Sequence, residues 1–262
     1  MDDKRIGIFD SGIGGTSIWG EIQELLPFEE CIYLADSKNA PYGEKPAEQI
    51  LALSIKNTEY LLGQGCKLIV VACNTATTNA IDYLRLNYDV PFIGIEPAIK
   101  PAAINTRSKI VGVLATKGTL SSSLFHSTSK NHTEGITVLE QRGTGLVEMI
   151  ESGNLDSEDL YRLLESYITP MLEKGMDYLV LGCTHYPYLI PLLKKMLPEN
   201  VTIIDSGQAV ARQTKSVLEH NDLLTSSEVM GAHQFFTNGD ENVLAAILQS
   251  VKAKHSVAFK DF

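Results

Sequence analysis

The chain has 262 residues, of which 44% are hydrophobic and 21% charged, with a formal net charge of −10 and a pI near 5.1. This length fits two domains better than one, and the apolar fraction is that of an ordinary globular protein. The acidic charge repels phosphate, so we expect no nucleic-acid partner, and no apolar run approaches the length that spans a membrane.

Eight short apolar runs, taken in chain order, predict strands at 5–10, 31–36, 68–74, 91–96, 110–116, 136–142, 178–184 and 202–207. Helical patterns between and after them predict helices at 15–26, 46–64, 75–87, 157–174 and 208–219. Continuously apolar strands are typical of parallel sheets covered on both faces. Their alternation with helices predicts right-handed βαβ units and an α/β fold.

The predicted strands form two sets of four that resemble each other. Gly65 lies eight residues before Cys73, and Gly175 lies eight residues before Cys183, with a similar apolar strand between each pair. This internal repeat predicts two pseudo-symmetric halves, each with a mainly parallel sheet flanked by helices and one cysteine at a strand end. The tail after about residue 208 is predicted to be helix-rich and could pack on either half.

The number and spacing of the cysteines argue against several classes of site. The chain contains four scattered cysteines: Cys31, Cys66, Cys73 and Cys183. They indicate neither a disulfide framework nor a C-x-x-C pair, and residues 1–9 lack the layout of a secretory signal, so we expect reduced thiols in the cytoplasm. Cys31 and Cys66 have no polar neighbours in sequence and are predicted to be core residues. A zinc site of Cys73, Cys183 and His185 lacks the usual ligand spacing, and we expect no metal.

Ligands of open α/β sheets bind at the carboxyl ends of the strands, and small polar or nucleophilic residues gather there in this sequence. The candidates in chain order are Asp10, Ser11, Asp36, Tyr42, Gly43, Cys73, Asn74, Thr75, Thr116, Cys183, Thr184, His185 and the run Asp205-Ser206-Gly207. Taken singly, most of them also fit as helix caps or turn residues, and Cys73 fits as a packed thiol. Two cysteines at equivalent strand ends favour a site.

Residues 12–17 ("GIGGTS") follow a strand and open a helix, which imitates a dinucleotide-binding fingerprint with Asp36 at the next strand end. The match is weak, because Ser17 takes the third glycine position and Asp10 would repel a pyrophosphate. The alternative is a tight turn that allows close packing, with backbone N–H groups free to face a small anion at the helix N-terminus.

Three chemistries use activated thiols at such positions. A cysteine hydrolase needs one nucleophile and one base, which leaves the second cysteine unexplained. A dithiol redox protein usually carries C-x-x-C. Proton transfer between two thiols, one on each face of a carbon, inverts a stereocentre and suits a pseudo-symmetric site. The repeat favours this third chemistry, which requires no cofactor.

Six motifs resemble those of the glutamate racemases, in the cofactor-independent aspartate/glutamate racemase superfamily. They are "GIFDSGIGG" (7–15), "YLADSKNAPYGEK" (33–45), "VVACNTAT" (70–77), "GVLATKGT" (112–119), "LGCTHYPYL" (181–189) and "DSGQAVA" (205–211). They span nearly the full chain in family order. Thr16, where an apolar residue is expected, and Tyr188 depart from the family wording.

The resemblance implies that Cys73 takes the α-proton of D-glutamate and Cys183 that of L-glutamate, with Asp10 and His185 assisting the thiols. It places six further residues around the substrate: Ser11, Tyr42, Gly43, Asn74, Thr75 and Thr184. Asp36 and Glu151 match acidic positions near the site. Thr116 and Thr119 of "GVLATKGT" are included as candidates.

The implied fold has two α/β domains, 1–96 plus 208–262 and 97–207, with the active site between them. The implied activity is interconversion of L-glutamate and D-glutamate without a cofactor, in a bacterial cytoplasmic homodimer that supplies peptidoglycan synthesis. Racemisation of aspartate, a thiol hydrolase and a non-catalytic amino-acid binding protein are the alternatives.

Overall fold

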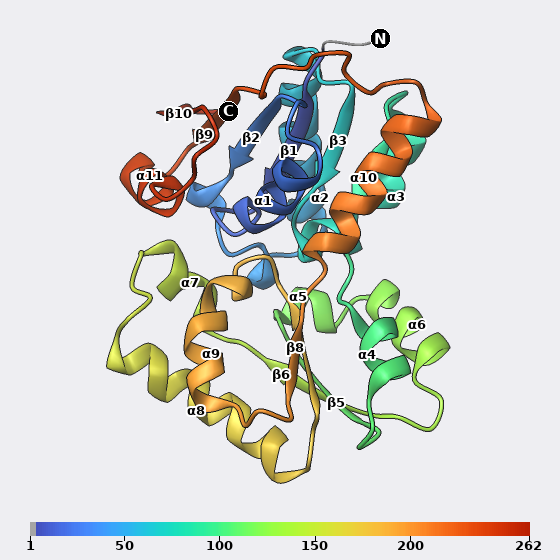
Figure 1. Ribbon diagram of the computed structural model, residues 1–262, viewed down its shortest axis with the longest axis vertical. Coiled ribbons are helices and arrows are strands. Elements are labelled where there is room, and N and C mark those ends of the chain that lie inside the picture. Colours follow the sequence, from blue (N-terminus) through green and yellow to red (C-terminus); the bar gives the residue numbers. More distant parts are fainter. Residues whose placement is uncertain (1–3) are drawn as a thin grey trace.

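The computed structural model describes residues 4–262 as two parallel sheets, each flanked by helices (Figure 1). Residues 1–3, on which the expected absence of a secretory signal partly rests, lie outside the described residues. Within 4–262, no helix has the length and apolar character needed to cross a membrane.

The first sheet has six strands in the order β10-β9-β2-β1-β3-β4, and every pairing is parallel. Its strands are β1 (Ile6–Asp10), β2 (Cys31–Ala35), β3 (Leu68–Val71), β4 (Phe92–Gly94), β9 (His233–Thr237) and β10 (His255–Phe259). The helices beside it are α1 (Thr16–Leu25), α2 (Ala47–Gly63), α3 (Asn74–Asn87), α10 (Gly207–His220) and α11 (Glu241–Leu248). Two short 3-10 helices, η1 (Ser37–Asn39) and η2 (Tyr42–Glu44), follow β2.

The second sheet has four parallel strands in the order β6-β5-β7-β8. They are β5 (Ile110–Ala115), β6 (Thr137–Arg142), β7 (Tyr178–Gly182) and β8 (Thr202–Ile204). Its helices are α4 (Ile99–Asn105), α5 (Lys117–Leu120), α6 (Ser123–His132), α7 (Leu146–Glu151), α8 (Glu158–Glu173), α9 (Ile190–Met196) and the 3-10 helix η3 (Tyr186–Leu189).

The internal repeat appears directly in the strand order. The segment β2-β1-β3-β4 of the first sheet corresponds to β6-β5-β7-β8 of the second. Cys73 follows the third strand of its set and Cys183 the third strand of the other. The predicted α/β class and the eight predicted strands are confirmed. The third, fourth, seventh and eighth strands end two or three residues earlier than predicted.

The tail differs from the helix-rich prediction, because it adds two strands to the first sheet. β9 pairs with β2, with Leu34 opposite Phe236 and Ala35 opposite Thr237, and α10 packs against α1 (Figure 1). The pattern of β9, "HQFFT", alternates between buried and half-buried positions and gives no continuous apolar run. The tail therefore returns to the first half, while the exact domain limits stay a prediction.

Burial of the strands fixes where polar side chains can gather. All residues of β1 and β3 are buried, because helices cover both faces of the sheet. Cys31 and Cys66 are buried as predicted, and burial raises the pKa of Cys66 to about 12. The loops after β1, β2 and β3 meet the loops after β5 and β7 between the two sheets (Figure 1), so the carboxyl ends of both sheets form one site.

Candidate active site

The loop after β1 is organised by Asp10, the last residue of the strand. Its Oδ2 accepts hydrogen bonds from Gly12 N at 3.2 Å and Gly15 N at 3.0 Å. Its Oδ1 accepts one from Thr184 Oγ1 at 3.1 Å, which ties the loop to the second half. Burial raises the pKa of Asp10 to about 6, although the charge of His185 opposes the shift. Asp10 is thus a weakly acidic carboxyl placed at the centre of the site.

The glycines of this loop are needed for close approach. A Cβ at Gly12 would overlap the Glu151 carboxylate, and a Cβ at Gly14 would overlap the His185 ring. Ile13 N donates to Glu151 Oε1 at 2.6 Å. The backbone N–H groups of residues 12–15 therefore face side chains of this chain rather than a bound pyrophosphate. The dinucleotide-binding alternative is wrong for this reason.

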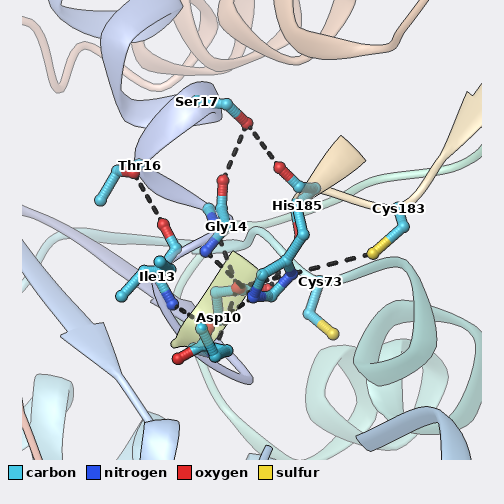
Figure 2. Close-up of polar contacts among 12 residues, drawn as sticks. Asp10, Ile13, Gly14, Thr16, Ser17, Cys73, Cys183 and His185 are labelled. Carbon is cyan, nitrogen blue, oxygen red and sulfur yellow. Dashed lines mark hydrogen bonds and ion pairs between the residues drawn. The ribbon is translucent and has the colours of Figure 1, made fainter. Parts of the chain in front are cut away.

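His185 connects the second cysteine to two carboxyl groups (Figure 2). Its Nδ1 lies 3.8 Å from Cys183 Sγ and 3.9 Å from Asp10 Oδ2, and its Nε2 lies 2.5 Å from Glu151 Oε1. Burial disfavours the charged ring, but the contacts with Cys183 and Glu151 raise the pKa of His185 well above its ordinary value. Burial also disfavours the Glu151 carboxylate, yet hydrogen bonding to His185 holds the pKa of Glu151 below its usual range. The contact between the ring and the carboxylate therefore favours the charged form of each group.

In the turn after β7, three residues separate the strand from the next helical segment. Cys183, Thr184 and His185 precede η3, which begins at Tyr186 with Pro187 in its first turn. Tyr186 N donates to the Cys183 carbonyl at 3.1 Å, and Ser17 Oγ donates to the Thr184 carbonyl at 3.0 Å. The turn is held by the first half of the molecule as well as by its own.

Cys73 is the N-cap of α3, and its Sγ accepts a hydrogen bond from Ala76 N at 3.4 Å. Burial and the charge of Asp10 raise the pKa of Cys73, while hydrogen bonds from Ala76 and Ser11 lower it. The Cys183 thiol also contributes to the rise. The two cysteines pack in different apolar clusters, but each lies at the edge that faces the site (Figure 2).

Three threonines lie beside Cys73 and join the halves. Thr75 Oγ1 lies 2.9 Å from Thr116 Oγ1 and 3.5 Å from Thr119 Oγ1. Thr116 also caps α5 by accepting from Thr119 N. A Cβ at Gly43 would lie 2.8 Å from the Thr116 Cβ, so the loop after β2 presses on the same group. These candidates are brought together as the motifs indicated.

Asn74 has the clearest signature of a ligand-binding group. Its side chain is 3% exposed, and neither its Oδ1 nor its Nδ2 has a hydrogen-bond partner in the protein. A buried amide without partners costs free energy unless something else satisfies it. The capping role that the sequence allowed belongs to Cys73 instead.

Asp36 and Tyr42 hydrogen-bond to each other, and Tyr42 packs in the same apolar cluster as Cys73. Asp36 Oδ2 accepts from the Tyr42 hydroxyl, and its Oδ1 accepts from Asn39 Nδ2 at 2.8 Å and Asn238 Nδ2 at 2.5 Å. The Tyr42 oxygen also accepts from Asn57 Nδ2 at 3.1 Å. The loop of residues 36–44, called the 36–44 loop below, is therefore built on a buried polar network.

Sequence reasoning missed several residues that join the halves. Thr16 and Tyr188, the two departures from the family wording, hydrogen-bond to each other through their hydroxyls. Arg142 Nη2 bonds both carboxylate oxygens of Glu44, at 2.6 and 2.7 Å. Both pairs join residues far apart in sequence. Only Thr16 and Tyr188 could have been noticed in the sequence, because both depart from the family motifs.

The run Asp205-Ser206-Gly207 lies at the start of α10. Asp205 Oδ1 accepts from Gly207 N at 2.7 Å, and Ser206 Oγ donates to the Glu96 carbonyl. These contacts lie at the beginning of α10. They join the two segments of chain that connect one sheet with the other. Among residues 4–262, no group of three or more His, Cys, Asp or Glu side chains is arranged to hold a metal ion.

The comparisons with known proteins agree with this geometry. The family described as Asp/Glu/Hydantoin racemase matches residues 24–214. A glutamate racemase of Herpetosiphon aurantiacus is 44% identical over 252 residues, which cover 96% of this chain and 99% of that protein. One of Pseudomonas syringae pv. tomato is 48% identical over 225 residues, covering 86% and 82%.

Solved structures give the same result. Escherichia coli glutamate racemase, in complex with L-glutamate and an activator, superimposes with a TM-score of 0.86 at 33% identity, covering 98% of both chains. The Francisella tularensis glutamate racemase, in complex with D-glutamate, gives a TM-score of 0.83 at 28% identity, covering 100% of this chain and 98% of its own. With matching sheets, a thiol at each equivalent strand end and relatives of this similarity over nearly its whole length, the chain belongs to the Asp/Glu/hydantoin racemase family.

Proposed function

We propose that this protein is a glutamate racemase that interconverts L-glutamate and D-glutamate by proton transfer between Cys73 and Cys183. The observation that carries the proposal is the placement of one thiol after the third strand of each matching sheet, on a shared site. Two bases related by pseudo-symmetry can address opposite faces of one α-carbon. The curated relatives and structural neighbours named above are glutamate racemases.

In the L-to-D direction, the Cys183 thiolate removes the α-proton and the Cys73 thiol delivers one to the opposite face. His185, 3.8 Å from Cys183 Sγ, assists that thiol, and Glu151 holds the ring in place. Asp10 assists on the Cys73 side, where Ser11 also hydrogen-bonds the sulfur. The reverse reaction exchanges the roles of the two thiols.

Neutral donors position the substrate in this proposal. The unpartnered amide of Asn74 and the hydroxyls of Ser11, Thr75 and Thr184 suit carboxylate and amino groups. Tyr42 and Gly43 contribute through the backbone, because the Tyr42 hydroxyl is engaged by Asp36 and Asn57. Thr116 and Thr119 orient Thr75, and Asp36 orients the 36–44 loop.

Exclusion of water has to help, because an amino-acid α-proton is far less acidic than a thiol. The two halves already meet at the mouth of the site. Residues 41–44 contact residues 142–148 there, where Glu44 pairs with Arg142. Preorganised donors in such a closed site stabilise the carbanion character that develops on the α-carbon.

The proposal also covers the domain limits, the oligomeric state, the location and the metabolic role of the enzyme. The domains are 1–96 plus 208–262 and 97–207, the enzyme works without a cofactor as a cytoplasmic homodimer, and its product supplies peptidoglycan synthesis. Size-exclusion chromatography with light scattering measures the oligomeric state. A monomer at enzyme concentrations that sustain full activity would contradict the dimer.

The activity is tested with L-glutamate in D₂O without added pyridoxal phosphate. The α-proton signal should disappear from the NMR spectrum while the optical rotation decays to zero. If folded protein racemises aspartate but leaves glutamate unchanged, the substrate is wrong. Binding of glutamate without exchange would indicate a binding protein, and hydrolysis of esters would indicate a thiol hydrolase.

A further inference from the structure

Asn238 lies outside the segment matched by the family and outside all six motifs, yet both polar groups of its side chain contact the 36–44 loop. It follows β9, which lies beside β2 in the first sheet. Its Nδ2 donates to Asp36 Oδ1 at 2.5 Å, its Oδ1 accepts from Lys38 N at 2.9 Å, and its own N–H donates to the Ala35 carbonyl at 3.4 Å. The side chain is buried, with 5% exposed.

The next residue continues the contact. A Cβ at Gly239 would lie 2.7 Å from the Ser37 Cβ, so the backbone of the tail presses directly on η1. Asn238 and Gly239 thus hold the start of the 36–44 loop from the side of β9.

The far end of the same loop contacts the opposite half. Gly43 packs on Thr116, and Glu44 pairs with Arg142. The start of the loop is therefore fixed by Asn238 within the first half. The end of the loop is held only where the two halves contact each other. A side-chain amide is suited to the fixed end, because it donates to a carboxylate and accepts from a backbone N–H at once.

We infer that Asn238 is a positioning residue for racemisation, holding the 36–44 loop against the active site through its bonds to Asp36 and Lys38. The inference rests on the proposed function. Asn238 acts through the loop, since its contacts are with Ala35, Asp36 and Lys38. Its loss should raise the KM for glutamate more than it lowers kcat, because the loop presents Tyr42 and Gly43 to the substrate.

The kinetic test compares Asn238→Ala with Asn242→Ala, which removes an exposed asparagine of the same tail that bonds only Asp240. Asn238→Ala should raise KM about tenfold, whereas Asn242→Ala should match the wild type. A wild-type KM in Asn238→Ala overturns the inference. So does a loss of activity that merely follows the fraction of unfolded protein measured by circular dichroism.

A charge exchange separates positioning from general damage. Asn238→Asp sets a carboxylate against Asp36 and should raise KM more than the alanine variant does. The double variant Asp36→Asn with Asn238→Asp restores one amide–carboxylate hydrogen bond and should recover a large part of the loss. A double variant that is no better than Asn238→Asp contradicts the specific contact.

Limited trypsin digestion tests the anchor without reference to activity. Release of the loop should expose the peptide bond after Lys38 and speed its cleavage about tenfold in Asn238→Ala but not in Asn242→Ala. Unchanged cleavage overturns the inference. A wild-type enzyme that fails to racemise glutamate would instead overturn the proposed function, while faster cleavage would still support the anchor.

Discussion

The two thiol sites have matching geometry but different electrostatics. The residue two positions after Cys183 is His185, which reaches Asp10 at the end of β1 and Glu151 at the end of α7. The residue two positions after Cys73 is Thr75, which reaches Thr116 and Thr119 in the equivalent place. One side is a buried ionic cluster and the other a cluster of hydroxyls.

The difference shows that two halves with the same fold can surround their thiols with different side chains. Asp10 ends β1, whereas its structural counterpart at the end of β5 is Ala115. One carboxyl is therefore shared, bonding Thr184 of the Cys183 turn while its charge raises the pKa of Cys73. The matching positions of the two thiols come from the repeat, whereas the difference in charge around them comes from single positions at which the two halves carry different residues.

Among the residues beside the thiols, the largest effect should come from His185→Gln. Glutamine can keep a hydrogen bond to Glu151 but cannot hold and transfer a proton near Cys183. We expect kcat/KM to fall about 10²- to 10³-fold, within the range of general acid–base catalysis. Because the two enantiomers have equal free energy in water, kcat/KM must fall equally in both directions. A decrease below threefold would show that the ionic cluster is not needed.

Asp10→Asn should separate activity from stability. The folded pKa of Asp10, about 6, lies above its ordinary value of 3.8, so the folded state binds the proton more tightly than the unfolded state does. Stability from this group is present below about pH 4 and is lost as the pH rises through 6.

The variant lacks this titration, so its stability relative to the wild type should increase by up to about 3 kcal/mol between pH 4 and pH 7. Urea unfolding at both pH values measures the difference in stability. The rate of racemisation by Asp10→Asn should be lower than that of the wild type. A difference that does not change with pH would contradict the assigned burial of this carboxyl.

Thr75→Val tests the neutral side at the position equivalent to His185. It removes one hydroxyl from the threonine cluster and preserves volume, so we expect a decrease in kcat/KM of about tenfold. Steady-state kinetics beside His185→Gln give the comparison directly. A larger loss for Thr75→Val than for His185→Gln would reverse the proposed division between the two sides.

The smallest effect should come from Tyr188→Phe. It removes the hydroxyl contact with Thr16 on the Cys183 side and should cost about 1 kcal/mol of stability. A double-mutant cycle with Thr16→Val should show coupling, because either single change breaks the same bond. Strictly additive free energies of unfolding would show that the contact contributes nothing.

Local patterns in the sequence were sufficient for β1 to β8, the repeat and the two cysteines, because each depends on residues close in sequence, but not for β9 and β10 of the tail. The placement of Glu151, the last residue of α7, against Gly12 and His185 depends on contacts between segments far apart in sequence. Asn238 could not be found either, since its role depends on β9 pairing with β2 across most of the chain. Glycine positions 12, 14 and 15 were visible, but which side chains approach them was not.

The most direct test of the central claim is α-proton exchange in D₂O with Cys73→Ser and Cys183→Ser, each given L-glutamate and D-glutamate separately. Neither variant should racemise. Cys73→Ser, which keeps the thiol assigned to L-glutamate, should exchange the α-proton of L-glutamate alone, and Cys183→Ser should exchange that of D-glutamate alone. Racemisation by either variant, or exchange of both enantiomers by one remaining thiol, would contradict a mechanism in which each cysteine serves one face of the substrate.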